Sequence, residues 1–566
     1  MSNKPWSRLG ILSLLVLLTG CSIPSGLMPW DLHDNRSDRQ QHAYAAGKLA
    51  DNSAAYDSDA QNQITNLYVT IMHQNLDRKH PYSWLELNGI NQPQDDDGRS
   101  LDAIFQEGDD SGPVHGMFGY SDYQVNSSIS LRGTESIKSA QKSYKIKLNG
   151  QAGAWRDQST INLVKSVGDL TRLRNKLSFD YIHSLPDMVS MRTSFVRLHV
   201  KDLSRDDAVD TFTDYGLYTQ IEQPNKAFLR AHGLDSSGSL YKAEKFTFDR
   251  SPDALKLEDD PSFDKSKFQD VLQIKGSRDH QKLLTMLDEL NDASGQAWDA
   301  VFKQHFDENN FLTWLASNIL MDQVDAASEN YLLYSPSESD KWFFIPWDYD
   351  DAWGRTPDSQ RAPWQHGLAA YWQNRLVQQY FREPQHVQQL QDKLDELRKI
   401  ITPAQTLQHI TAYRKVIDSV IAQSNDPGYL PGTLDARDAE LRRLPNVTEQ
   451  SYQAFVQGLQ APMPFQLHEP DTQNRTLHLS WDASYDLQHE PLTYKLIISR
   501  SPAMDKPVVQ INTGSKTATD VSSLNSGRYF WTVTAIDTSG HTAMPYDQYT
   551  DIDDAIHYGV RQLYVQ

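Results

Sequence analysis

The sequence predicts an α+β body followed by a smaller all-β sandwich, and three patterns along the 566 residues support this prediction. Apolar residues alternate in several segments between Ile64 and Leu148, which indicates strands. Residues 297–323 and 368–444 repeat apolar residues at helical spacing. After residue 462 short alternating segments return between Pro-, Gly-, Asn- and Asp-rich turns. Strands and helices therefore share the region 61–455, and strands alone build the region 462–550.

Alternating apolar residues predict the strands of the body in chain order. Four segments before residue 150 carry such a pattern, and two more follow a predicted helix at 169–184. The six predicted strands are residues 64–71, 81–89, 125–131, 142–148, 195–200 and 215–221. The acidic run at 95–98 lacks the oxygen spacing of a calcium loop, so it is interpreted as a solvated turn.

The region 462–550 carries the pattern of a β-sandwich. Leu479-Ser480-Trp481 and the segment Tyr529 to Ala535 place tryptophans within alternating strands. These pieces resemble a fibronectin type III module, which implies a spacer or binding platform. Residues 551–566 are then expected to be a C-terminal tail.

The first 21 residues indicate export and lipidation. Lys4 and Arg8 precede an apolar run at 11–18 that is too short to span a bilayer as a helix. Leu18-Thr19-Gly20-Cys21 resembles the lipobox of bacterial lipoproteins, and Cys21 is the single cysteine of the chain. The prediction is a signal peptide at 1–20, a lipid on Cys21 and a flexible tether at 21–60. An ordinary signal peptide with an incidental cysteine is the alternative.

The residue after Cys21, the net charge and the cysteine count limit the location of the protein and its classes of partner. Ser22 stands where an aspartate would retain a Gram-negative lipoprotein in the inner membrane, which favours the outer membrane. The formal charge of −20 repels phosphate backbones, so a nucleic-acid partner is not expected. With Cys21 lipidated, the exported chain has no thiol for a disulfide, a nucleophile or a metal site. The histidines show no pairing that indicates a metal.

One segment carries a pattern of catalytic residues. Asp325 follows a predicted helix, Asn330 lies five positions later, and a predicted hairpin ends at Asp348-Tyr349-Asp350. Protein kinases order an acid that accepts the hydroxyl proton, a metal-binding Asn, a hairpin and a metal-binding Asp in this way. A hairpin that starts at the Asn and ends at the Asp returns the two side chains to one cation.

The match to kinases is partial. Gln323-Val324 stands where kinases have His-Arg, Asp-Tyr-Asp replaces Asp-Phe-Gly, and the chain has no G-x-G-x-x-G loop. Taken singly, each residue also fits a structural interpretation. Asp325 could close a loop, Asp350 could belong to a solvated turn, and Lys145 could lie on the outer face of a strand.

Several segments in chain order resemble the CotH (spore coat protein H) kinase-like family, from about residue 64 to about residue 445. These segments are Leu131 to Ser136, Lys142 to Leu148, Leu170 to Asp180, Tyr215 to Gln223, Leu240 to Lys242, Asn330-Tyr331 and Ile345 to Asp350. The resemblance implies an atypical, two-lobed protein-kinase-like fold and ATP-dependent phosphorylation of proteins.

The resemblance also implies roles for individual residues on the acidic side. Asp325 becomes the catalytic acid, and Asn330 and Asp348 become ligands of Mg²⁺ or Mn²⁺. Asp350 is an additional candidate ligand.

The phosphates of ATP or another nucleotide would be bound by basic residues. Lys145 is preferred, with Lys142 and Lys147 as alternatives on or next to the same strand. Arg132 and Gly133 lie in the preceding turn, where a glycine lets the backbone approach a phosphate. Glu222, at the end of a predicted strand, receives no role.

Two functions of different class follow. The first is an exported kinase that phosphorylates a hydroxyl of an envelope or surface protein. The order of acidic residues and amide favours this enzyme. The second is a non-catalytic surface-assembly or adhesion lipoprotein that retains a kinase-like scaffold. A third, weaker hypothesis is carbohydrate binding through exposed aromatic side chains at Trp353, Trp364 and Trp372.

Overall fold

The structure is a computed structural model that describes residues 48–57, 63–205, 209–357, 360–473, 476–522 and 524–565. The predicted signal peptide, Cys21 and most of the predicted tether lie outside these residues. Residues 48–57 differ from the prediction, because they pack against the body. Within them the 3₁₀ helix η2 (Ser53–Tyr56) brings the Tyr56 hydroxyl to the carbonyl oxygen of Ser190 at 2.9 Å. Within the described ranges no helix is long and apolar enough to cross a membrane.

Eight strands form a sheet that closes on itself, here called the ring body. Strand β1 pairs in parallel with β7 and antiparallel with β2, so the order β1-β7-β8-β6-β5-β4-β2 returns to β1, with β3 at the edge. The strands are β1 (Ile64–Ile71), β2 (Leu101–Asp109), β3 (Gly112–Pro113), β4 (Ser127–Arg132), β5 (Ser143–Leu148), β6 (Thr160–Val164), β7 (Thr193–Asp202) and β8 (Thr213–Glu222).

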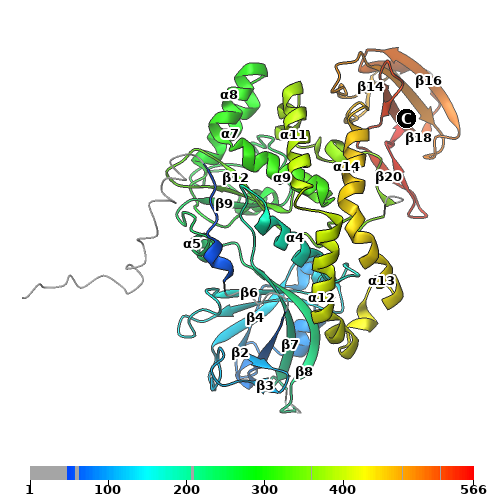
Figure 1. Cartoon of the computed structure of the whole chain (residues 1–566). Helices are drawn as coiled ribbons and strands as arrows, with labels where there is room; N and C mark the ends of the chain where they lie inside the picture. The colour runs from blue at the N-terminus through cyan, green and yellow to red at the C-terminus, as the bar shows by residue number, and fades with distance from the viewer. Residues whose placement is uncertain are drawn as a thin grey trace, which may run out of the picture.

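Alternation on β5 decides which side chains fill the ring. Tyr144, Ile146 and Leu148 are buried in its apolar core, whereas Lys145 and Lys147 are exposed on the outside. Figure 1 shows the ring in the lower part of the view, in colours from blue through cyan to blue-green.

The predicted strand at 81–89 is wrong, since residues Trp84–Gly89 form the helix α2. A capping box starts this helix. The Ser83 side chain accepts a hydrogen bond from the Glu86 backbone N–H, and the Glu86 carboxylate accepts one from the Ser83 N–H at 2.8 Å. The Ser-x-x-Glu spacing signals a helix start and outweighs the short apolar alternation that follows it.

The short helix α3 (Thr134–Lys138) follows β4, whereas the helices after residue 170 and a small four-stranded sheet form what we call the helical body. The predicted helix at 297–323 is interrupted, because Asp307 caps a new helix by accepting a hydrogen bond from the Asn310 N–H at 2.8 Å. The small sheet has the order β10-β9-β11-β12. The elements are α4 (Arg174–Ser184), α5 (Lys226–Ala231), β9 (Ser239–Ala243), α6 (Lys265–Val271), β10 (Leu272–Ile274), α7 (Gln281–Asp292), α8 (Gly295–His305), α9 (Glu308–Leu320), β11 (Tyr331–Ser335), β12 (Phe343–Pro346), α10 (Arg375–Tyr380), α11 (Pro384–Leu397), α12 (Pro403–Gln423), α13 (Leu434–Arg443) and α14 (Val447–Gly458).

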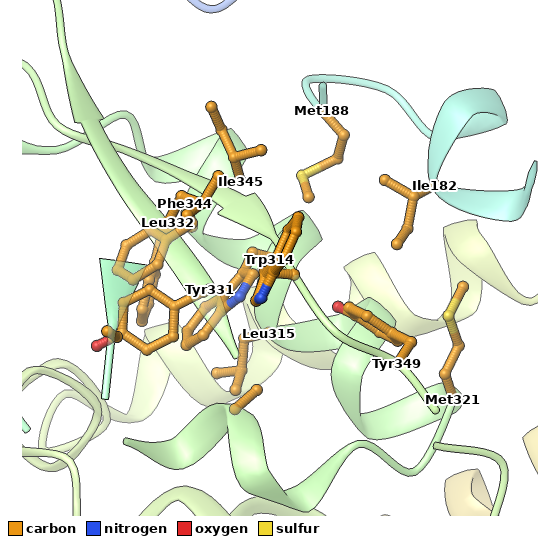
Figure 2. Packing of buried hydrophobic residues seen from close by; sticks show 14 of the residues in the cluster. Ile182, Met188, Trp314, Leu315, Met321, Tyr331, Leu332, Phe344, Ile345 and Tyr349 are labelled. Carbon is orange, nitrogen blue, oxygen red and sulfur yellow. The ribbon is translucent and has the colours of Figure 1, made fainter. Parts of the chain in front are cut away.

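Aromatic packing supports the β11–β12 hairpin from below. Trp314 of α9 stacks on Phe344 with ring centroids 4.2 Å apart and meets the edge of Tyr331 at 5.3 Å (Figure 2). Asn310 of the same helix accepts a hydrogen bond from the Phe344 N–H at 2.7 Å and donates one to the Phe344 carbonyl oxygen at 3.1 Å. The hairpin is therefore held by both apolar and polar contacts to one helix.

The C-terminal strands form a three-stranded and a five-stranded sheet around a separate apolar core that includes Trp481 and Trp531, and β20 and β21 pair as a third, two-stranded sheet. The predicted C-terminal tail is instead part of the fold, because β22 pairs with β18. The strands are β13 (Asp471–Gln473), β14 (Thr476–Ser480), β15 (Thr493–Ser499), β16 (Pro507–Gly514), β17 (Ala518–Ser522), β18 (Gly527–Ile536), β19 (Thr542–Ala543), β20 (Gln548–Thr550), β21 (Ile556–Tyr558) and β22 (Arg561–Val565). The prediction of a mixed α+β chain with a later all-β region is confirmed (Figure 1).

The exposed aromatic surface proposed for carbohydrate binding is absent at these positions. Trp353 and Trp372 are buried. Trp364 is half-buried and meets the rings of Tyr546 and Tyr558 of the C-terminal sheets edge-on. These side chains pack the molecule together, so the carbohydrate hypothesis has no structural basis.

Candidate functional site

A cleft of about 970 Å³ separates the ring body from the helical body. Residues from β4, β5 and β6 line one wall, and residues from β9, β10 and the segments flanking the β11–β12 hairpin line the other. Every site residue assigned by the resemblance borders this cleft except Lys142 and Lys147. The residues in question are Arg132, Gly133, Lys145, Asp325, Asn330, Asp348 and Asp350.

The hairpin returns Asn330 and Asp348 to the same end of the small sheet. Tyr331 pairs with Pro346, and the Trp347 N–H donates to the Asn330 carbonyl oxygen at 3.1 Å. Asn330 has φ 60° and Asp348 has φ 56°. Asn and Asp adopt this left-handed region more readily than other non-glycine residues, so the two side chains fit the sharp turns at this end of the hairpin.

The acidic side of the cleft holds three carboxylates that form no close ion pair within the described residues, although the charge of Arg355 acts on Asp325 and Asp350 and opposes the increase of their pKa values. Burial raises the pKa of Asp325 to about 7, and the neighbouring charge of Asp351 acts in the same direction. Burial and the charge of Asp348 raise the pKa of Asp350 well above its usual range. No residue in the described part of the chain donates a hydrogen bond to, or forms an ion pair with, the carboxylates of Asp325, Asp348 or Asp350. A cation bound beside these carboxylates would favour their charged forms.

This donor set fits a cation that shares its coordination with phosphates. Asp348, Asp350 and the Asn330 amide offer hard oxygen ligands. Mg²⁺ is usually bound by one or two carboxylates together with substrate phosphates and water. The described residues contain no group of three or more His, Cys, Asp or Glu side chains that would enclose a metal by themselves. The oxygens therefore fit Mg²⁺ or Mn²⁺ held jointly by protein and ligand.

The basic side of the cleft contains residues that sequence reasoning did not assign. Lys242 of β9 and Lys275, just after β10, line the wall opposite Lys145 and Arg132. Burial lowers the pKa of Lys275 to about 8, and the positive charge of Lys242 contributes to the decrease. Burial also lowers the pKa of Arg132, against the opposing effect of Asp348. Lys242 belongs to one of the segments that resemble the CotH family, Leu240 to Lys242, but no sequence pattern singles out Lys275.

Two more cleft residues were missed. Arg355 forms an ion pair with Asp351 and lies against Gly168, where an added Cβ would come within 2.5 Å of its Nη1. Burial raises the pKa of Glu329, and the charge of Glu244 adds to the increase. The sequence signal for Glu329 was present, since it lies between Asp325 and Asn330.

The two alternative lysines do not border the cleft. The Lys142 ammonium donates to the carbonyl oxygens of Ile90 and Ile137, each at 2.6 Å, so it links the end of α2 to the short helix Thr134–Lys138. Lys147 is exposed two residues beyond Lys145 on the same outer face. Of the three lysines considered for phosphate binding, Lys145 is the one that borders the cleft.

Glu222 belongs to a buried network of charged side chains outside the cleft. Its carboxylate is buried, pairs with Arg192 at 2.5 Å and lies 2.8 Å from Nε2 of His232. Nδ1 of His232 lies 2.7 Å from the Asp51 carboxylate. This network fastens residues 48–57 to the end of β8.

Comparisons with known proteins identify the family of this chain. The model of the CotH kinase protein family matches residues 129–455, which is more than half of the chain and includes every residue assigned to the site. The chain is also similar to inner spore coat protein H of Bacillus subtilis (strain 168), with 24% identity over 253 residues. That alignment covers 44% of this chain and 66% of the relative, just under two thirds of its length. The chain belongs to the CotH kinase protein family.

Proposed function

We propose that this protein is an exported CotH-type atypical kinase that transfers a phosphoryl group from a nucleotide to a protein hydroxyl at the cell envelope. One observation carries the proposal. A single cleft places three carboxylates that form no close ion pair within the described residues beside lysine and arginine side chains contributed by the opposite wall. The ring body and helical body would then be the two lobes of the kinase-like fold.

The acidic residues would hold the cation and the acceptor proton. Asn330, Asp348 and Asp350 would bind Mg²⁺ or Mn²⁺, which neutralises the charge of the phosphates when bound. The Asp325 carboxylate would accept the proton of the acceptor hydroxyl. Its pKa of about 7 suits a group that takes up a proton near neutral pH.

The basic residues would position the nucleotide. Lys145 and Arg132 would bind phosphate oxygens, and the Gly133 backbone, at φ 78°, leaves room for a close approach. The acceptor oxygen forms the new P–O bond while the bond to the departing nucleoside diphosphate breaks. Positioning and electrostatics supply most of the acceleration in such transfers.

Transfer of labelled phosphate tests the enzymatic proposal. We expect the purified full chain with Mg²⁺ and labelled ATP to phosphorylate itself or an envelope protein, and Asp325→Ala to abolish the reaction. Asp253→Ala, which removes an exposed aspartate of the helical body, is the matched control. A nucleotide present at about 100 times its Kd should also stabilise the chain by roughly 2.7 kcal/mol. Absence of both effects would favour the alternative, a surface-assembly scaffold without catalysis.

The location at the envelope rests on the N-terminal pattern ending at Cys21. We propose a lipid-anchored outer-membrane protein whose substrate is a surface or periplasmic protein. The name of the similar Bacillus protein places that protein in a spore coat, which agrees with action outside the cytoplasm. Labelled palmitate should be incorporated by the natural chain and not by Cys21→Ser. Incorporation by both would contradict the proposed anchor.

The C-terminal sheets would serve as a fibronectin type III-like platform. The Tyr529 hydroxyl donates to the Asn525 carbonyl oxygen at 2.8 Å, four residues upstream. A tyrosine that bonds back to the nearby upstream backbone is a feature of immunoglobulin-like sandwiches.

A further inference from the structure

Two lysines of the helical body face two basic residues of the ring body across the cleft. The β9–β10 register pairs Lys242 with Gln273, and Lys275 lies two residues beyond Gln273. Directly paired residues point to the same face of a sheet, as do residues two apart on one strand. Lys242, Gln273 and Lys275 all border the cleft, as this register requires. On the opposite wall are Lys145 of β5 and Arg132 at the end of β4.

Within the described residues three of these four positive side chains form no close ion pair, although the charge of Glu244 acts on Lys275 and the charge of Asp348 acts on Arg132. Among the described residues, none forms an ion pair with Lys145, Lys275 or Arg132, although the chain carries a formal charge of −20. Lys242 pairs with Glu244 at 2.6 Å. Burial lowers the pKa of Lys275 to about 8, and the charges of Lys242, Lys145 and Arg132 contribute to the decrease. Clustering like charges costs free energy unless an anion joins them.

Building on the kinase function proposed above, we propose that Lys242 and Lys275 bind the polyphosphate of the nucleotide from the side opposite Lys145 and Arg132. The polyphosphate would thus contact both bodies, and its binding would join them. Neither lysine was assigned a role by sequence reasoning. Phosphate binding by these two lysines can be measured separately from phosphoryl transfer.

The composition of the cleft favours a polyphosphate over other anions. Its volume of about 970 Å³ suits a ligand of nucleotide size. An acidic peptide would place carboxylates near Asp348 and Asp350, which repel them. A polyphosphate with a divalent cation satisfies both sides, because its oxygens bind the lysines while the cation binds the aspartates.

Calorimetric titration of the full chain tests this inference. The probes are Mg²⁺-ADP, Mg²⁺-tripolyphosphate and adenosine, which separate the contribution of the phosphates from that of the nucleoside. We expect Lys275→Met to raise the Kd of both phosphate ligands by about tenfold or more, and Lys242→Met to have the same direction of effect. Adenosine binding should not change, and Lys275→Arg should restore most of the affinity for the phosphates.

Matched controls separate a local contact from a general loss of charge. Lys267→Met removes an exposed lysine of α6, and Lys147→Met removes the exposed lysine next to Lys145 on the outer face of β5. Both should leave each Kd within about twofold. Because Lys275 has no ion pair to lose, Lys275→Met should fold, and Lys275→Gln provides a second variant for the same comparison.

The possible results distinguish this inference from the proposed function. If the natural chain binds Mg²⁺-ADP and Lys275→Met binds it equally well, the inference is wrong and the kinase proposal stands. If the natural chain binds and Lys275→Met weakens both phosphate ligands but no phosphate is transferred, the inference stands and the kinase proposal is wrong. If the natural chain binds neither phosphate ligand, both are wrong.

Discussion

The Gln323 side-chain amide donates a 2.6 Å hydrogen bond to the backbone carbonyl oxygen of Asp348. Gln323 is itself fixed, because its N–H donates to the Asn318 carbonyl oxygen and its carbonyl oxygen accepts from the Tyr371 hydroxyl, both at 2.9 Å. The loop that carries Asp325 therefore holds the backbone of Asp348 in its left-handed conformation. The two acids of the candidate site are positioned as one unit.

Removing this contact should weaken metal binding more than folding. We expect Gln323→Ala to lower the free energy of unfolding by about 1–3 kcal/mol, since a buried carbonyl oxygen loses its partner. The Mg²⁺- and ADP-dependent rise in melting temperature should be largely lost. Thermal unfolding with and without ligand measures both effects. Gln388→Ala, at an exposed position of α11, is the control, and equal ligand responses in the two variants would argue against this role.

Neutralising Asp350 should stabilise the metal-free protein. Its carboxylate lies near Asp348, and the favourable charge of Arg355 does not outweigh burial and this repulsion, so Asp350→Asn removes a net unfavourable interaction. We expect the free energy of unfolding in EDTA to rise by about 1–3 kcal/mol, while stabilisation by Mg²⁺ and nucleotide is lost. Chemical denaturation provides the measurement, with Asp253→Asn as the exposed control. Destabilisation in EDTA would show that Asp350 has a partner in the folded state.

The stability of the metal-free protein should depend on Asp325 in a defined pH range. The folded-state pKa of about 7 exceeds the ordinary value of 3.8, so the folded state retains a proton that the unfolded state has released. The contribution of this group to stability therefore decreases as the pH rises from about 4 to about 7. Denaturation in EDTA across this range should show a smaller decrease for Asp325→Asn than for the natural chain. If the free energy of unfolding changes with pH in the same way for both proteins, the pKa of Asp325 is not raised in the folded state.

A buried ion pair between Lys165 and Asp426 joins the ring body to the segment after α12, with both side chains fully buried and 2.7 Å apart. Asp426 also accepts a hydrogen bond from the Leu217 N–H at 2.8 Å. Asp426→Asn should destabilise the protein by about 3–5 kcal/mol, because it leaves a buried lysine without its counter-charge. Asp438→Asn, which removes a partly exposed partner of Arg414, should cost less than about 1 kcal/mol. Chemical denaturation measures both variants. Equal decreases in the free energy of unfolding would show that the buried ion pair stabilises the protein no more than the exposed one.

His232 should stabilise the protein below alkaline pH. Burial by itself would lower its pKa, but the carboxylates of Glu222 and Asp51 overcome this effect and raise the pKa to about 9. The contribution is complete below about pH 6.5, the ordinary value, and is lost as the pH rises through about 9. The advantage of the natural chain over His232→Gln should therefore shrink between pH 6 and pH 10. His115→Gln, at an exposed position, should show no such trend.

Local sequence patterns predicted the features that depend on neighbours in the chain. Alternation on 143–148 assigned Lys145 and Lys147 to the outside of the ring, and the segment 331–346 was expected as a hairpin that returns Asn330 to Asp348. The strand at 81–89 was wrong because a Ser83–Glu86 capping box acts over three residues within an apolar alternation. The tail at 551–566 was misjudged because the pairing of β22 with β18 joins segments about thirty residues apart.

The sequence by itself determined the family, the mixed α+β class and the order of acids and amide around the hairpin, since strand alternation, helix spacing and short motifs act over a few residues. Only the tertiary structure decided that Lys242 and Lys275 face Lys145 and Arg132, and that Lys142 links two short helices outside the cleft. These relationships depend on how a closed ring of strands packs against a separate helical body. No local pattern records the distance between side chains that meet only after both bodies have folded.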